Sequence, residues 1–257
     1  ATAIPAGGRD TFDGWYGAAG IEKQVSPTFT VGFALSYTST QGTTKTGATA
    51  KGELYQGTLY GKLGMANGFG LDGVFSAGLF DTHMVRSASL VGTPYTLRSN
   101  DQALAVSGEA GVSWMANLGG LKFGPRAAVR YGDIGFSDTA EAGGPMALRI
   151  DREGVHSTQG RLGLTLGGSK GKVRPYLTGY YVHDFDNQPA SFGANFVGGV
   201  GPAAQFALTG RDKDWWEASG GLAVDMKNVT LSVGADTTID RSDVKNQSYR
   251  GSITFRF

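Results

Sequence analysis

The sequence has no cysteine, only eight prolines among 257 residues and a formal net charge of +1. The absence of cysteine excludes disulfide frameworks and metal sites built on thiolates. The near-neutral charge gives no indication of nucleic acid or a strongly acidic partner. No segment approaches the ~18 consecutive apolar residues that a membrane-spanning helix needs. The sequence therefore excludes a disulfide-stabilised domain and a helical membrane protein.

Glycine, by contrast, is abundant: 42 residues are glycine, more than twice the ~7% of average usage. Many of these glycines fall inside segments in which apolar and polar residues alternate. In 121–131, leucine, phenylalanine and valine occupy one parity, whereas Lys122, Arg126 and Arg130 occupy the other. Because successive side chains of a strand point to opposite faces, this segment predicts a strand with one apolar and one charged face.

About eleven segments with this alternation run along the chain, each of roughly ten residues or more. They lie near 15–25, 29–40, 52–66, 70–86, 102–116, 121–133, 146–168, 173–185, 214–226, 229–240 and 247–257. Short turns alternate with long polar connections, which span 41–51, 87–101, 134–145, 186–213 and 241–246. This alternation predicts antiparallel hairpins with their tight turns at one end and their long loops at the other. Since no linker divides the sequence, we expect an N-terminal segment over 1–13 and one barrel domain over 14–257.

Two architectures fit such hairpins, a soluble sandwich or barrel and a transmembrane barrel. A soluble sandwich buries its apolar face in a core of densely packed, bulky side chains. Here the polar parity mixes charges of both signs with glycine, serine and threonine, which suits a water-filled lumen, and aromatic residues lie toward strand ends, where a membrane-interface girdle would lie. We therefore predict an all-β fold, a transmembrane antiparallel up-and-down β-barrel. Its predicted lumen-lining residues are Lys62, Asp72, Glu109, Lys122, Arg126, Arg130, Arg161, Arg174, Glu217, Asp236, Arg250 and Arg256.

The predicted lumen charges permit two interpretations. An arginine stripe on neighbouring strands, from Arg126 to Arg174, lies opposite a smaller acidic set that includes Glu109 and Glu217. Such a stripe could hold a polypeptide linker or bias the passage of ions. It could also solvate the lumen and pair across strands, and we favour this interpretation because opposite charges on adjacent strands stabilise a sheet.

Catalysis within this chain would need a nucleophile, a base and oxyanion donors placed together. The three histidines, His83, His156 and His183, lie toward the long-loop end of the predicted barrel, where a surface enzyme would keep its site. Ser157 follows His156 directly, but adjacent residues of a strand point to opposite faces, which argues against a catalytic pair. We therefore interpret the histidines as hydrogen-bonded rim residues and predict no catalytic residue, no metal site and no cofactor.

In the last predicted strand, near 247–257, apolar and polar residues alternate with the same regularity. Tyr249, Ile253, Phe255 and Phe257 share one of its faces. A terminal strand of this kind, ending in phenylalanine, resembles the C-terminal targeting signal of bacterial outer-membrane proteins. That resemblance implies recognition by the barrel-assembly machinery, which pairs with this strand. The alternative is that the segment is only the closing strand of a β protein.

A hairpin over 14–37 resembles the corresponding hairpin of autotransporter β-domains, although Glu22-Lys23 stands where that family usually has Asp-Tyr. Further loose motifs follow in the family's order, namely Gly70-Leu71-Asp72-Gly73, Arg86, Pro125, 135–143, Ala147-Leu148 and Leu162-Gly163-Leu164. Together these motifs cover nearly the whole chain. They are most similar to the lipolytic-esterase autotransporters.

The resemblance implies a type V secretion translocator in the bacterial outer membrane, with a periplasmic C-terminus and extracellular long loops. Barrels of this family have twelve strands, so we expect the first strand to lie upstream of residue 1. The implied partners are outer-membrane lipid, the barrel-assembly machinery and the protein's own N-terminal passenger or linker in the pore; we expect no nucleic acid and a monomer. This domain would not be an enzyme, although an absent passenger could be an esterase. A small outer-membrane diffusion channel, or a barrel enzyme with its site among the extracellular loops, is the alternative.

Overall fold

The computed structural model describes residues 11–44, 47–168, 171–186, 191–199, 203–207, 212–242 and 245–256. Within these ranges the chain forms sixteen β-strands. No helix long and apolar enough to span a bilayer occurs among the described residues. The predicted all-β class is therefore confirmed.

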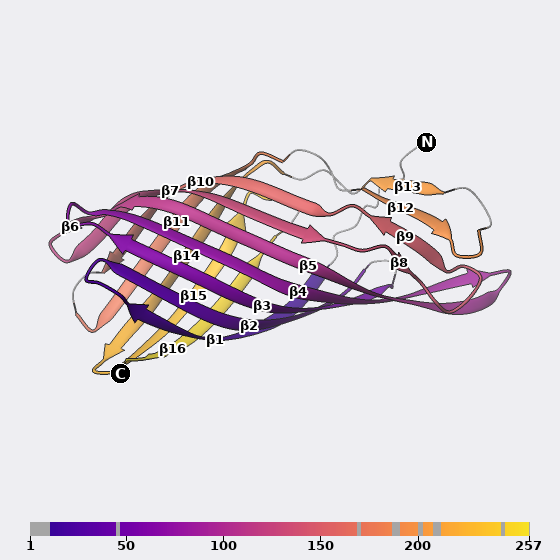
Figure 1. Cartoon of the computed structure of the whole chain (residues 1–257), viewed down its shortest axis with the longest axis horizontal. Coiled ribbons are helices and arrows are strands. Elements are labelled where there is room, and N and C mark those ends of the chain that lie inside the picture. The colour runs from indigo at the N-terminus through magenta and orange to yellow at the C-terminus, as the bar shows by residue number, and fades with distance from the viewer. Residues whose placement is uncertain are drawn as a thin grey trace.

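Eleven strands follow one antiparallel path in which each strand pairs with its neighbours in chain order. Figure 1 shows this sheet strongly curled, with the tight turns and the C-terminus at one end. A twelfth, short strand, β6 (Ala116–Leu118), pairs only with β7. The path consists of β1 (Thr11–Gln24), β2 (Phe29–Thr43), β3 (Thr49–Gly64), β4 (Phe69–Leu90), β5 (Thr93–Trp114), β7 (Leu121–Gly135), β10 (Val155–Gly168), β11 (Val173–Asp184), β14 (Asp214–Met226), β15 (Val229–Ile239) and β16 (Gln247–Phe255).

The two ends of this path, β1 and β16, run in the same direction because nine strands alternate between them. Neither has a ladder partner on its outer edge within the described part of the chain. The guanidinium of Arg250 in β16 nevertheless lies near enough to the phenol of Tyr16 in β1 for an electrostatic interaction. A strand running opposite to both edges would satisfy their free backbone groups. That further strand remains a prediction, as does the boundary at 13/14, and residues 1–10 lie outside the described ranges.

A second, four-stranded sheet lies at the other end of the molecule, above the far ends of β4 and β5 in Figure 1. It has the order β13-β12-β9-β8 and contains β8 (Thr139–Ala140), β9 (Leu148–Arg152), β12 (Ser191–Phe196) and β13 (Ala204–Ala207). The predicted single strand at 146–168 is wrong in this respect, because the chain leaves the second sheet after β9 and enters the main sheet only at β10. Glu153 and Gly154 form the break, and β10 then pairs with both β7 and β11.

The predicted loop at 87–101 is also wrong, because β4 and β5 continue as a hairpin of 22 residues on each side. Val91 and Gly92 close this hairpin with φ angles of 49° and 80°. Positive φ at both central residues is the turn geometry that matches the twist of paired strands. The hairpin therefore extends well beyond the pairing of β5 with β7, which begins at Leu104.

Glycines inside the strands make room for long side chains that lie across neighbouring strands. A Cβ on Gly32 in β2 would collide with the ring of Tyr60 from β3. A Cβ on Gly163 in β10 would likewise collide with the ring of Tyr180 from β11. At these positions glycine is needed for close side-chain packing over the sheet, as expected where a strand glycine allows a close approach.

Candidate functional site

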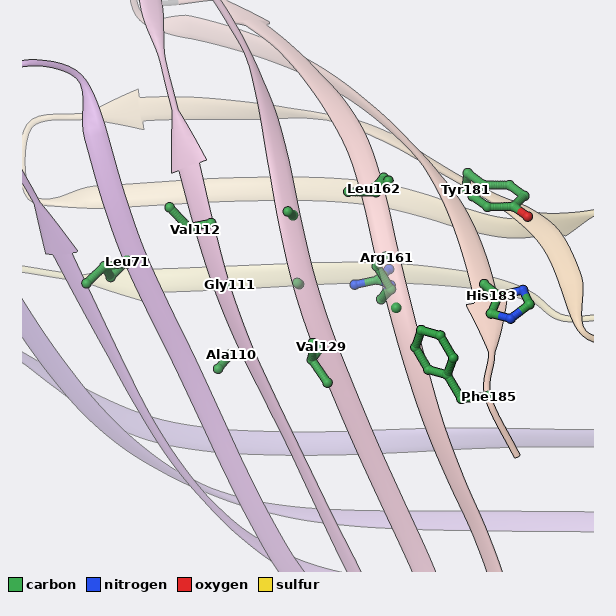
Figure 2. A pocket seen from close by; sticks show the side chains of 13 residues that line it. Leu71, Ala110, Gly111, Val112, Val129, Arg161, Leu162, Tyr181, His183 and Phe185 are labelled. Carbon is green, nitrogen blue, oxygen red and sulfur yellow. The ribbon is translucent and has the colours of Figure 1, made fainter. Parts of the chain in front are cut away.

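The main sheet separates two faces with opposite chemistry. Directly paired residues share a face, so Glu109 of β5 and Arg130 of β7 lie on the same side. The other parity carries side chains such as Leu162 and Leu164, which are 62% and 65% exposed, whereas Arg161, directly before Leu162 in β10 (Figure 2), is 7% exposed. We call these the apolar face and the charged face. Side chains of the apolar face are exposed, whereas those of the charged face are buried by contacts with one another.

Glu109 is the centre of the charged face. Its Oε1 accepts a hydrogen bond of 2.8 Å from Nη2 of Arg126, and its Oε2 accepts bonds of 2.8 Å from Nε of Arg130 and Nη1 of Arg161. The side chain of Glu109 is only 12% exposed. Arg126 also forms a two-pronged ion pair with Asp72 of β4. One carboxylate thus connects three arginines from two different strands.

Glu217 of β14 completes this cluster from the opposite side. It pairs with Arg161 and lies 3.5 Å from Nη1 of Arg130, while the indole of Trp215 donates to its Oε1 at 3.3 Å. Three arginines and three carboxylates therefore form one formally neutral group. We call it the six-residue ion network; it comprises Asp72, Glu109, Arg126, Arg130, Arg161 and Glu217.

Tyr180 of β11 covers the network. The guanidinium carbon of Arg161 lies 4.2 Å from the centre of the Tyr180 ring, within the range of a cation–π contact. Nη1 of Arg126 donates to the Tyr180 hydroxyl at 3.4 Å. Nothing in the sequence distinguishes Tyr180 from other strand tyrosines. Its ring lies over Gly163, where a Cβ would collide with it. A polar cavity of ≈ 280 Å³ adjoins the network beside β14, β15 and the start of β16.

A second charged cluster lies toward the tight-turn end. Asp225 of β14 forms an ion pair with Arg174, whose Nη2 donates to Oδ1 at 3.1 Å. It also accepts hydrogen bonds from Nη2 of Arg256 at 3.3 Å and from the hydroxyl of Thr230 at 2.6 Å. Of the remaining predicted lumen residues, Asp236 pairs with Arg250, Lys62 lies over the Tyr60 ring and Lys122 is opposite Gly167 in the β7–β10 ladder. Ten of the predicted residues thus meet in cross-strand ion pairs, which agrees with the pairing interpretation.

Aromatic side chains form part of a belt on the apolar face, toward the long-loop end. The Tyr37 ring centre lies 5.3 Å from that of Trp15 and 4.9 Å from that of Tyr55, so β1, β2 and β3 contribute one row. Tyr181 and Trp216 form a similar pair at 5.4 Å on β11 and β14. Such rows are typical of the interfacial girdles of membrane barrels.

The proposed assembly-signal residues lie on the same apolar face. Tyr249, Ile253 and Phe255 of β16 are 79%, 62% and 66% exposed. Phe257 lies outside the described residues. Their exposure leaves one side of the last strand free for another apolar surface, and their role as a signal remains a prediction.

Ion pairs that the sequence did not predict hold the second sheet against the long β4–β5 hairpin. Arg86 of β4 donates to both carboxylate oxygens of Glu141, at 2.6 and 2.5 Å, and the Glu141 side chain is only 5% exposed. Glu141 also accepts the backbone N–H of Leu148 at 2.9 Å. Arg152 of β9 reaches Asp101 of β5 at 3.4 Å. Arg86 belongs to a motif noted in the sequence, but nothing there indicated its partner.

The three histidines contact acceptors near strand ends rather than one another. His83 Nδ1 lies 2.8 Å from Asn100 Oδ1, His156 Nε2 lies 3.6 Å from Asp186, and His183 Nδ1 lies 2.7 Å from Asp214. The Ser157 hydroxyl donates to Asp184 at 2.8 Å. Across the described ranges, no group of three or more potential metal ligands is present. These contacts suit rim residues held by neighbouring strands and loops.

The fold is shared with translocator structures of low sequence identity. The translocator domain of autotransporter NalP from Neisseria meningitidis is 16% identical, with 96% of this chain and 82% of that chain covered at a TM-score of 0.75. The transport unit of the autotransporter AIDA-I from Escherichia coli is 14% identical, with 96% and 84% covered and a TM-score of 0.58. The β-domain of the Bordetella autotransporter BrkA is 18% identical, with 96% and 91% covered and a TM-score of 0.60.

Among curated proteins, no sequence matches this chain. The family model of the autotransporter β-domain, however, matches residues 6–236, which is most of the sequence. The curled antiparallel sheet, its two chemically distinct faces and this match agree with one another. The chain belongs to the autotransporter β-domain family, and it is an outer-membrane translocator barrel.

Proposed function

We propose that this barrel exports an N-terminal passenger across the outer membrane along a route lined by its charged face. In this proposal the apolar face contacts lipid, the tight turns and the C-terminus face the periplasm, and the long-loop end faces the cell exterior. The route then contains the twelve residues predicted from the sequence to line the lumen.

The neutrality of the six-residue ion network is the observation that supports this role best. A binding surface for one kind of charged ligand would present charges of one sign without internal partners. Here Glu109 and Glu217 already pair with arginines from adjacent strands. Because these charges satisfy one another, a polypeptide of mixed composition would meet few free charges strong enough to retain it. A wall of this kind suits the passage of a polypeptide better than its retention.

The passenger or its linker would occupy the pore. A barrel of about twelve strands has room for a helix or an extended chain, but not for a folded domain. We further propose that the barrel acts as a monomer, and that the barrel-assembly machinery recognises the apolar side of β16 through Tyr249, Ile253 and Phe255, followed by Phe257.

Export can be tested with a reporter fused upstream of the complete chain behind a secretory signal. The proposal predicts that the reporter reaches the cell surface, where protease added to intact cells digests it. The matched control is the same reporter with the signal but without the barrel, which should stay protected in the periplasm. A reporter that remains protected in both fusions, although the barrel is folded in the outer membrane, would refute export.

Two alternatives give different results in the same preparation. A diffusion channel predicts steady conductance in planar bilayers that persists when an N-terminal helix is present, whereas a translocator predicts that the helix closes the pore. A barrel enzyme predicts lipase or protease activity from this domain alone. We propose that the domain is not catalytic and that ester hydrolysis, if the full-length protein shows it, belongs to the passenger.

A further inference from the structure

The largest buried side chains gather at the long-loop end of the charged face. Among the described residues, the three largest that are fully buried are Leu97, Val182 and Trp215. Trp215 pairs directly with Val182, which pairs directly with Arg161, so the three share the charged face. Leu97 lies on the same face, because it precedes Glu109 in β5 by an even number of positions. Apolar packing therefore covers this face where the proposed route meets the cell exterior.

The second sheet takes the place of β7 beside the outer part of β5, since the pairing of β5 with β7 begins only at Leu104. Arg98 of β5 and Ala142 form an antiparallel bridge with two backbone hydrogen bonds of 2.9 Å. The Thr139 hydroxyl of β8 donates to the carbonyl of Asn100 at 2.9 Å. The second sheet thus extends the wall of the barrel at the long-loop end.

This extension folds toward the charged face. Arg152 of β9 lies 3.4 Å from Asp101 of β5 and donates to Sδ of Met84 of β4 at 3.5 Å. In a flat sheet β9 would lie three strand spacings from β4, which is about 14 Å. Side chains that stand perpendicular to such a sheet could not meet across that distance. The contact therefore requires β9 to curl over the outer parts of β4 and β5.

An ion pair holds the curled sheet beside Leu97. Arg86 of β4 is paired directly with Leu97, and its guanidinium donates to both carboxylate oxygens of Glu141. The chain that follows Glu141 lies close to β5, because a Cβ on Gly143 would be 3.4 Å from Cα of Leu97. We call the pair of Arg86 and Glu141 the clasp. It lies on the charged face, between the second sheet and the long hairpin.

The other side of the mouth is covered from the end of β15. The guanidinium carbon of Arg241 lies 4.1 Å from the centre of the Trp215 ring. The Ser242 hydroxyl contacts both carboxylate oxygens of Asp212, at 2.9 and 2.8 Å, just before β14 begins. The Trp215 indole in turn donates to Glu217, so this packing joins the six-residue ion network.

We infer that the second sheet is a gate that closes the cell-surface end of the empty pore and swings away from the β4–β5 hairpin when a passenger passes. An open mouth would leave Leu97 and the side chains around it facing water, so the hydrophobic effect favours the closed arrangement when nothing occupies the pore. The inference rests on the proposed export function, because it assigns the gate to the exit of that route.

The second sheet has the construction of a movable element. β8, its strand nearest to the hairpin, has only two residues, so its separation from β5 breaks few backbone hydrogen bonds. Glu153 and Gly154 alone connect β9 to β10, and such short connections absorb the dihedral changes of a hinge. The long ladders of the main sheet would stay intact during this motion, as expected for local opening.

A disulfide across the bridge of Arg98 and Ala142 tests whether the gate must open. Directly opposed residues of an antiparallel pair have Cα atoms about 5.5 Å apart, which suits a disulfide. The chain has no other cysteine. In the reporter fusion, Arg98→Cys with Ala142→Cys should lower surface export at least tenfold, and dithiothreitol should restore it. Thr165→Cys with Thr178→Cys, a paired position within the main sheet, is the matched disulfide control and should export normally.

Conductance of the purified full chain in planar bilayers tests the same gate without a passenger. The wild-type barrel should open only briefly. Glu141→Ala removes the acceptor of the clasp and should raise the fraction of time in the open state several-fold. Arg149→Ala, an exposed position on β9, is the matched control and should behave like wild type. Far-UV circular dichroism first establishes that each variant is folded.

Two results would overturn the gate. One is wild-type export by a barrel whose Arg98→Cys and Ala142→Cys disulfide has formed. The other is a folded Glu141→Ala variant with the same open fraction as wild type. If no barrel exports the reporter, wild type included, the proposed function fails instead, and the conductance of Glu141→Ala still decides whether the second sheet closes the pore.

Discussion

The guanidinium of Arg250 in β16 donates a hydrogen bond of 3.1 Å to the hydroxyl of Tyr176 in β11, across the two strands between them. This contact is possible because Tyr176 lies over Gly221 in β14 and Gly234 in β15, where any Cβ would collide with it. A side chain thus links strands that are not neighbours in the sheet. The contact also connects β16, at the end of the strand order, to β11, which lies within the sheet.

Gly234→Ala should therefore destabilise the barrel, because the new methyl group meets the Tyr176 hydroxyl. Overpacking of this kind costs about 1–3 kcal/mol. Thermal unfolding of the purified barrel measures the effect. Tyr176→Phe removes the colliding oxygen, so Gly234→Ala should lower the stability less in the Tyr176→Phe variant than in wild type. Gly220→Ala, whose Cβ would meet only an ordinary contact at 3.5 Å, is the control. Equal losses for both glycines in both backgrounds would contradict the packing role.

Glu109→Gln should destabilise the barrel more than a comparable change at the surface. The substitution removes the negative charge that three arginines share, and hydrogen bonds to charged groups contribute ~1.5–3 kcal/mol each before relaxation. We expect a loss of about 2–3 kcal/mol in the free energy of unfolding. Glu153→Gln, at the exposed break before β10, should have little effect. If Glu109→Gln behaves like this control, the network does not stabilise the wall.

Arg86→Ala should loosen the second sheet without unfolding the main one. It leaves the Glu141 carboxylate buried beside Leu148 without its cation, which costs about 2–3 kcal/mol of local stability. Hydrogen exchange should accelerate in 139–152, whereas β10 and β11 should stay protected. Arg149→Ala, an exposed position on β9, should leave exchange unchanged. Acceleration throughout the barrel would show instead that the two sheets unfold together.

The second sheet should also respond to pH through two aspartates, Asp138 and Asp151. The Asp138 carboxylate raises the pKa of Asp151 above its usual value, by Coulombic repulsion first and a shared hydrogen bond second. A raised pKa in the folded state means that this group stabilises the sheet at acidic pH and that the contribution is lost as pH rises through the ordinary value of 3.8 toward the raised one. Asp138→Asn should slow hydrogen exchange in β9 at pH 7 relative to wild type. Below pH 3.8 the two proteins should match, and a difference of the same size at both pH values would contradict this explanation.

The strands of the main sheet could be predicted from the sequence because apolar and polar residues alternate over many positions in each of them. The segment Leu162–Leu166 is an example: three leucines on one face alternate with Gly163 and Thr165 on the other. The second sheet could not be predicted, because β8 and β13 have two and four residues and carry no usable alternation. The turn at Val91-Gly92 was missed for a related reason, since β-branched valine rarely adopts a positive φ.

The site was predictable in kind but not in detail. Alternation placed Arg126, Arg130 and Arg161 on one face, and the register of adjacent strands then decided their partners. Register is set by turns and packing along the whole hairpin, and it cannot be read from one strand at a time. Tyr180 was missed because its contact with Arg161 depends on Gly163 in another strand.

Thiol accessibility tests the two-face assignment most directly, since the natural chain has no cysteine and each introduced thiol is unique. Single cysteines at Leu164, Thr165, Leu177 and Thr178 place adjacent residues on opposite faces of β10 and β11. In barrels reconstituted into lipid vesicles, a charged, water-soluble maleimide should label Thr165→Cys and Thr178→Cys. Leu164→Cys and Leu177→Cys should react only after denaturation. Labelling of the two leucine positions with protection of the two threonine positions would contradict the assignment of the apolar face to lipid and the charged face to water.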